Sequence, residues 1–223
     1  YEINRSPAKV QSALLEAMQE RQVTIGDETI KLPTPFLVMA TQNPIETEGT
    51  YPLPEAQVDR FMMKILVDYP TDEEEFVIVQ RVTGPAVPVN AVATTDQLAA
   101  LQRACRSVYV DPSLIQFAVR LVSATRTPEK HDLKELTRFI TYGASPRASI
   151  NLTEGSRALA MLRGRSYVLP EDMADLVPDV LRHRLVLSYE ALSEGLSADA
   201  IIAKITAKIP APAKPLEHEK LAA

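Results

Sequence analysis

The sequence predicts an α/β region followed by an all-α region, that is, part of a parallel-sheet core and then a small helical bundle. Two short, mainly apolar runs at 36–40 and 62–67 are typical of strands buried on both faces of a parallel sheet. From residue 95 onwards the apolar residues recur at helical spacing instead. Because 46% of the 223 residues are hydrophobic, the chain can build packed cores in both parts.

The elements of the first part follow from local signals. Ser6 and Pro7 predict a helix start, with Ser6 as the cap, and apolar residues then recur on one helical face. Segments 22–24 and 29–32 flank Gly26 and predict a β-hairpin. A strand, a loop, a helix and a second strand complete this part, which is consistent with one portion of an α/β sheet.

The second part opens with an acidic cluster at 72–75, which suits the positive end of a new helix. Gly and Pro at 84–88 indicate a linker, and further helices are predicted to start at Asp111, Pro146 and Leu169. The pattern predicts only helices after Thr95, with Leu98, Leu101, Cys105 and Val108 on one face. We therefore divide the chain into a core part at 1–70, a connecting helix and linker at 71–94, a helical unit at 95–207 and a flexible tail at 208–223.

Composition argues against several classes of function. The net charge is −5 and the basic residues are scattered, which argues against a nucleic-acid-binding protein. Cys105 is the only cysteine, so no internal disulfide or cysteine-rich metal site is possible, and we expect it to be a buried helix residue. The three histidines are widely spaced, so we predict no metal site and a packed helix position for His183. No run is long enough to span a membrane, and a cytoplasmic location is expected.

Two polar residues near the predicted strands suit a nucleotide's terminal phosphate. Hydrolysis of a γ-phosphate needs an oriented water, a base and positive charge over the phosphate oxygens. Glu2 precedes a capped helix, where a strand would end, so its carboxylate can polarise the attacking water; the alternative is an ordinary exposed glutamate. Asn43 follows the first apolar run, at the edge where α/β sheets bind ligands, although Asn-Pro is also a common turn.

Two arginines complete the set. Arg60 lies between Asp59 and Phe61, and an arginine held by a carboxylate and an aromatic ring can reach the phosphate of a partner subunit. The alternative is a local surface pair of Asp59 with Arg60, which contributes little. Arg147 follows Ser145 and Pro146 at a predicted helix start, where an anion is favoured, unless the motif is only a helix cap. Each residue alone is weak support, so the interpretation depends on their order and spacing.

These motifs, taken together, resemble the MoxR family of AAA+ ATPases up to about residue 200. The matching stretches are 2–5, 11–18, 22–24, 40–44, 48–56, 59–61, 143–147, 167–172 and 180–185. The resemblance implies a partial αβα AAA+ core followed by a helical lid. It also implies the roles of the candidates: Glu2 as the Walker B glutamate, Asn43 as sensor 1, Arg60 as an arginine finger acting in trans and Arg147 as the sensor 2 arginine.

The resemblance further implies ATP and Mg²⁺ as cofactors and a ring, usually a homo-hexamer, with ATP bound between subunits. Such proteins remodel or mature partner proteins, often ones that carry von Willebrand factor A domains. The loop 45–56 would then be a subunit-interface element near the nucleotide, instead of a merely solvated loop.

The sequence departs from the family pattern in two places. No glycine-rich Walker A loop occurs, and Tyr1 stands where the resemblance implies the Walker B aspartate. We interpret the chain as truncated, not degenerate, because the later motifs are intact, and we expect residues 1–223 alone to be inactive. A Mg²⁺·ATP site cannot be assembled from these residues by themselves.

Two other functions stay open. A non-catalytic interaction module whose lid docks partners fits the absence of the Walker A loop, but it leaves four phosphate-type residues without a purpose. A related AAA+ branch, such as the magnesium chelatase subunits or a nucleic-acid motor, is the other alternative. The acidic charge balance makes the motor the weaker candidate.

Overall fold

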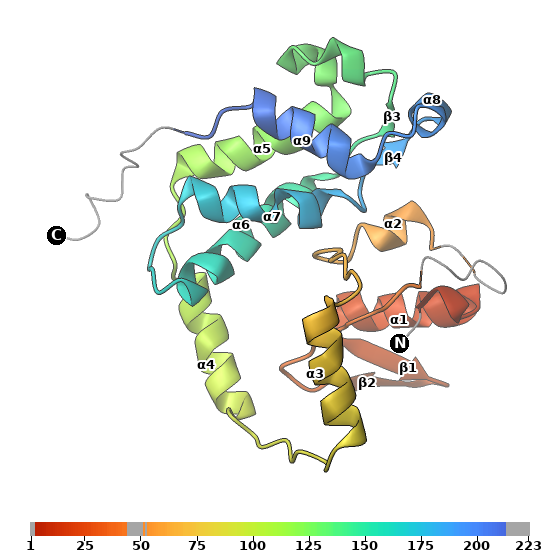
Figure 1. Ribbon diagram of the computed structural model, residues 1–223, viewed down its shortest axis with the longest axis vertical. Helices are drawn as coiled ribbons and strands as arrows, with labels where there is room; N and C mark the ends of the chain where they lie inside the picture. The colour runs from red at the N-terminus through yellow and green to blue at the C-terminus, as the bar shows by residue number, and fades with distance from the viewer. Residues whose placement is uncertain (1–2, 44–50, 52, 213–223) are drawn as a thin grey trace.

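A computed structural model describes residues 3–43, 51 and 53–212 of the chain (Figure 1). It consists of a group of short N-terminal elements, two exposed helices on an extended connection, and a packed helical bundle. The last helix ends at Lys208, and of the predicted tail at 208–223 the part from residue 213 onwards lies outside the described residues.

The N-terminal group confirms the predicted hairpin. Its elements are η1 (Ile3–Arg5), α1 (Ala8–Glu20), β1 (Gln22–Ile25), β2 (Glu28–Lys31) and, after the undescribed loop residues, α2 (Glu55–Val58). The strands β1 and β2 pair antiparallel, and Gly26 takes the left-handed φ of 64° in the turn between them. Helix α1 starts at Ala8 with Pro7 as its N-cap, so the prediction of Ser6 as the cap was wrong by one position.

The two apolar runs predicted as buried parallel strands are not strands in this structure. Leu37 is 80% exposed, Met39 is 78% exposed and Val67 is 91% exposed. A parallel strand makes its backbone hydrogen bonds with neighbouring strands, and among the described residues both sheets are antiparallel pairs that exclude these runs. The apolar pattern is therefore present without the partners that would turn it into a sheet.

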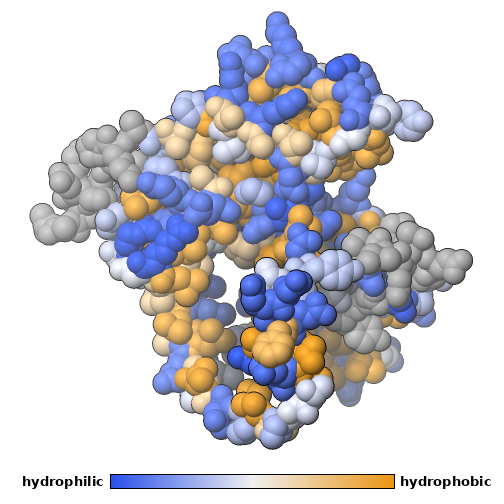
Figure 2. Space-filling view, in the orientation of Figure 1, coloured by the Kyte–Doolittle hydropathy of each residue, from blue (hydrophilic) through white to orange (hydrophobic). Residues whose placement is uncertain are grey.

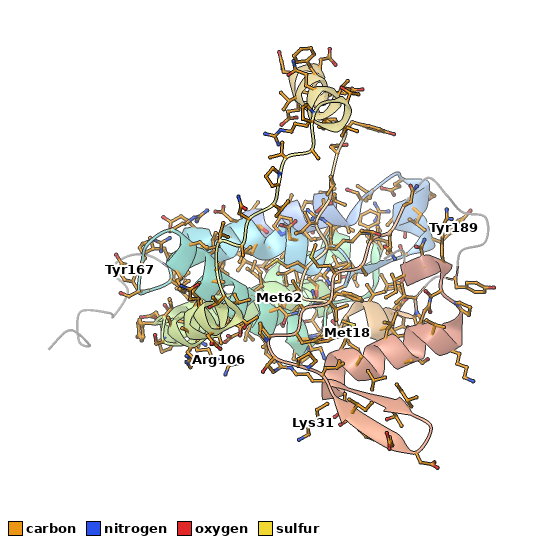
Figure 3. All side chains as sticks on the ribbon, turned by 90° about the horizontal axis from the view of Figure 1, so that it is seen from below. Met18, Lys31, Met62, Arg106, Tyr167 and Tyr189 are labelled. Atoms are coloured by element: carbon orange, nitrogen blue, oxygen red, sulfur yellow. The ribbon has the colours of Figure 1, made fainter. Side chains whose placement is uncertain are left out.

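Two helices follow on an extended connection, α3 (Asp72–Thr83) and α4 (Thr95–Arg106). The predicted acidic start of α3 is confirmed, because Thr71 and Glu74 form a capping box in which each side chain accepts from the other's backbone N–H. Figure 3 shows α3 standing apart from the body of the molecule. Apolar side chains of both helices are exposed, including Phe76 on α3 and Leu98 and Leu101 on α4. Figure 2 shows hydrophobic surface over this part of the molecule.

The bundle contains the main core. It consists of α5 (Pro112–Arg126), α6 (Pro146–Leu162), α7 (Pro170–Leu181) and α9 (Ala198–Lys208), whose fully buried side chains include Leu121, Leu152, Met173 and Ile202. Asp172 is also fully buried at the start of α7, where it accepts from the Leu169 N–H at 2.8 Å and pairs with Arg163 and Arg165. The predicted acidic opening of this helix is therefore confirmed.

The bundle also contains a small sheet that the sequence analysis missed. Strands β3 (Ile140–Tyr142) and β4 (Val186–Leu187) pair antiparallel. Two short elements, η2 (Pro128–His131) and η3 (Lys134–Leu136), precede β3 in the sequence, and α8 (Tyr189–Ser193) follows β4. Strands of three and two residues are too short to show a strand periodicity. None of the described helices has the length and hydropathy needed to cross a membrane.

Candidate functional site

Two of the predicted motifs meet at the carboxylate of Asp59, which lies directly after α2. Its Oδ2 accepts from Ser145 Oγ at 2.8 Å and from Arg147 Nη1 at 3.2 Å, and its Oδ1 accepts from Arg184 Nε at 2.9 Å. We call these four residues the Asp59 junction. It joins the N-terminal part to the helical bundle, and Figure 1 shows α2 between α1 and the bundle helices.

The electrostatics of the junction favour an ionised Asp59. Burial by itself would raise the pKa of Asp59, but hydrogen bonds from Ser145 and Arg147 and the charge of Arg184 hold that pKa below its usual value. Burial lowers the pKa of Arg184, and the charge of Asp59 opposes this effect. An arginine stays protonated in any case, so Asp59 and Arg184 form a charged pair in a largely buried setting.

The local structure around Arg147 follows from its motif. Ser145 is the N-cap of α6 and accepts from the Arg147 N–H at 3.2 Å, while Pro146 takes the first helical position, as predicted. The Arg147 side chain is 48% exposed. It therefore lies at a positive helix end with room to move towards an anion.

Arg60 lies beside the junction but is not held by Asp59. The sequence analysis expected that carboxylate to hold Arg60, and this was wrong because Asp59 pairs with two arginines of the bundle. The Nε atom of Arg60 is buried and has no hydrogen-bond partner. Buried polar atoms are normally paired, so this atom is one place where the described structure leaves a binding capacity unused.

Asn43 belongs to a second neighbourhood, around η1 and α1. The Ile3 N–H donates to the Thr41 carbonyl at 3.2 Å, and Asn43, which is half-buried, follows two residues later. The Gln11 side chain, buried on α1, donates to the carbonyls of Ile3 at 3.3 Å and Tyr51 at 3.1 Å. Glu2 itself and most of the acidic loop, residues 44–50 and 52, lie outside the described residues.

Three consecutive residues after α7 hold the segment 61–64, and we call Arg182, His183 and Arg184 the lid triplet. Arg182 donates to the Lys64 carbonyl at 2.7 Å, and His183 Nε2 lies 3.2 Å from the Phe61 carbonyl. His183 is packed, as predicted, but just beyond the helix and not within it. Burial, with the charge of Arg184 adding to it, lowers the pKa of His183 to about 4.

The segment also packs through its methionines. A Cβ atom placed on Gly155 of α6 would lie 3.1 Å from Met63 Cε and 3.4 Å from Met62 Cε, so the glycine lets both side chains approach the helix. Figure 3 shows Met62 in the body of the molecule. Among the described residues, no three His, Cys, Asp or Glu side chains form a group that could hold a metal ion.

Comparisons with known proteins agree with this arrangement. Residues 1–63 match the model of the ATPase family associated with various cellular activities (AAA), and residues 136–205 match the AAA lid domain. Over 95% of its length the chain is 49% identical to Chaperone MoxR1 of Mycobacterium tuberculosis and 43% identical to YeaC of Bacillus subtilis. The chain belongs to the MoxR-type AAA+ ATPases.

The fold of this MoxR-type chain is confirmed by a solved structure from Cytophaga hutchinsonii, described as a candidate ATPase. The two are 48% identical with a TM-score of 0.91, and the match covers 95% of this chain and 65% of that one. The chain spans 56% of the length of MoxR1 and 64% of YeaC. A partial AAA+ core followed by a helical lid is therefore the correct fold class.

Sequence reasoning missed the roles of Arg182 and Arg184 of the lid triplet in this MoxR-type chain, and the junction role of Asp59. The stretch 180–185 was noted as a match to the family, and of its residues only His183 was predicted to be packed. A signal was available, since three consecutive basic residues follow an apolar helix face and must find acceptors when they are buried.

Proposed function

We propose that this MoxR-type protein hydrolyses ATP and uses the energy to remodel or mature partner proteins. The Asp59 junction is the observation that carries the proposal. It brings Arg147 to the segment that contains Arg60, although Asp59 and Arg147 are 88 residues apart in sequence. Preorganised positive charge over the oxygens of a reacting phosphate is the main requirement of phosphoryl transfer.

The roles follow from position. Arg147, at the positive end of α6, would bind the phosphates of ATP through its exposed guanidinium. Arg60 would serve the site of a neighbouring subunit, reaching its phosphates through the terminal nitrogens of the guanidinium. Asn43 would orient the attacking water, and Glu2 would polarise it.

ATP with Mg²⁺ would be the cofactor, and the described residues fit the nucleotide through these two arginines. Mg²⁺ in ATPases is usually held by phosphates and one or two carboxylates, so it needs no cluster of protein ligands. The Walker A loop belongs to the proposal for the whole protein, not to these 223 residues.

We further propose a homo-hexameric ring in the cytoplasm, where ATP is available, with partners that carry von Willebrand factor A domains. A site shared between subunits supports a ring, because an arginine that serves a neighbour requires a head-to-tail interface that closes. The family of the chain and the name of MoxR1 support chaperone-like action.

The experiment is ATP turnover by the whole protein over a wide range of protein concentrations, with Glu2→Gln as the inactive control. We expect specific activity to rise with concentration, because the site is complete only between subunits. Activity that is independent of concentration across the range in which the ring assembles contradicts a shared site. No turnover by the folded protein, with or without a partner, contradicts the ATPase proposal itself.

A further inference from the structure

The side chain of Arg184 is fully buried although it carries a charge. Its Nε donates to Asp59 Oδ1 at 2.9 Å, and its Nη2 donates to the carbonyls of Asp59 at 3.0 Å and Phe61 at 2.5 Å. Its Nη1 donates to the carbonyls of Met62, at 3.2 Å, and Val180. All three N–H-bearing nitrogens of the guanidinium are therefore engaged, and most of their acceptors are in one short segment.

These acceptors lie on both sides of Arg60. One planar group fixes the backbone at residues 59, 61 and 62, and so limits the directions in which the Arg60 side chain can leave the chain. A lysine could not replace this arrangement, because its three donors sit on one nitrogen and do not form a rigid fork. The contacts therefore require arginine specifically.

We propose that Arg184 is a positioning residue for Arg60, holding the backbone of the 59–62 segment so that Arg60 points at the nucleotide of the neighbouring subunit. This inference rests on the proposed function, in which Arg60 acts between subunits. Because Arg184 follows α7 of the lid, its contacts also make the position of Arg60 depend on the position of the lid. Arg184 itself contacts no substrate in this role.

The test uses Arg184→Lys in the whole protein, with Arg182→Lys as the matched control. The control makes the same chemical change at a neighbouring lid arginine, which contacts Lys64 and two aspartates but not the backbone at 59–62. Misplacing a catalytic group by about 1 Å can lower a rate by about 10²-fold. We expect Arg184→Lys to lower kcat by about this factor and to leave the ATP affinity unchanged. Arg182→Lys should keep the kcat of the wild type, and circular dichroism should show that both variants are folded.

Subunit mixing separates positioning of Arg60 from a general structural role. A ring mixed from Arg184→Lys and Glu2→Gln subunits has some interfaces where an intact Arg60 faces an intact nucleotide site, about one in four by random assembly. We expect turnover to return in this mixture, as it should for Arg60→Ala mixed with Glu2→Gln. A mixture that stays inactive while the Arg60→Ala mixture recovers overturns the role of Arg184. If neither mixture recovers although the wild type is active, the proposal that Arg60 acts in trans fails first, and this inference fails with it.

Discussion

Replacing Asp59 by Asn tests whether the Asp59 junction is a buried charged pair or a surface contact. The change keeps the shape of the side chain and one acceptor oxygen but removes the negative charge. Arg184 would then stay charged and fully buried, with only neutral acceptors. We expect the N-terminal part and the lid to lose stability together.

The loss of unfolding free energy expected for Asp59→Asn follows from the exposure of each charged partner. Breaking a buried pair by removing one charge costs about 3–5 kcal/mol. The Asp59 side chain is 15% exposed and Asn keeps a hydrogen bond, so we expect the low end, about 3 kcal/mol. The half-exposed Arg147 adds less than about 1 kcal/mol. For a chain of this size the midpoint of thermal unfolding should fall by about 6–12 °C.

The assay is urea and thermal unfolding of Asp59→Asn beside Glu190→Gln. The control removes the carboxylate charge from a pair with Arg138 in which the side chains are 54% and 46% exposed, so its loss should stay below about 1 kcal/mol. Equal losses in the two variants would refute the reasoning, because burial would then not distinguish the pairs.

Three further outcomes are expected. Arg60→Ala in the whole protein should reduce ATP turnover by about 10³–10⁵-fold with ATP binding largely intact, measured by steady-state hydrolysis and equilibrium binding; a folded variant that loses both contradicts the role in trans. Gly155→Leu should lower the free energy of unfolding by about 1–3 kcal/mol in denaturant titrations, because a Cβ at this position would lie 3.0 Å from Leu176 Cδ1 and 3.1 Å from Met63 Cε. Gly155→Ala should cause a smaller loss, and an unchanged stability of Gly155→Leu would show that the contact is loose. Folding disfavours the protonated form of His183, because its pKa falls from 6.5 in the unfolded chain to about 4 in the folded one. Neutral His183 therefore contributes fully to the free energy of unfolding above pH 6.5, and this contribution is lost as the pH falls towards 4. The free energy of unfolding should therefore drop by up to about 3 kcal/mol over that window, and His183→Gln should remove this part of the drop in urea titrations at several pH values.

Local structure was largely predictable from the sequence because its causes are local. The hairpin around Gly26, the acidic start of α3 and the Ser145–Pro146 start of α6 each depend on residues within a few positions of one another. The two apolar runs are the counter-example. Their composition suits a buried parallel strand, but a strand forms only beside a partner strand, and the described residues provide none.

The sequence by itself determined the family, through the order of its motifs, and the candidate residues Glu2, Asn43, Arg60 and Arg147. Only the tertiary structure decided how the charges pair. Asp59 is bound by residues 86, 88 and 125 positions away instead of by the adjacent Arg60. No sequence period links such distant groups: burial and mutual distance select the partners of a charge, and both exist only once the lid has packed against the segment that follows α2.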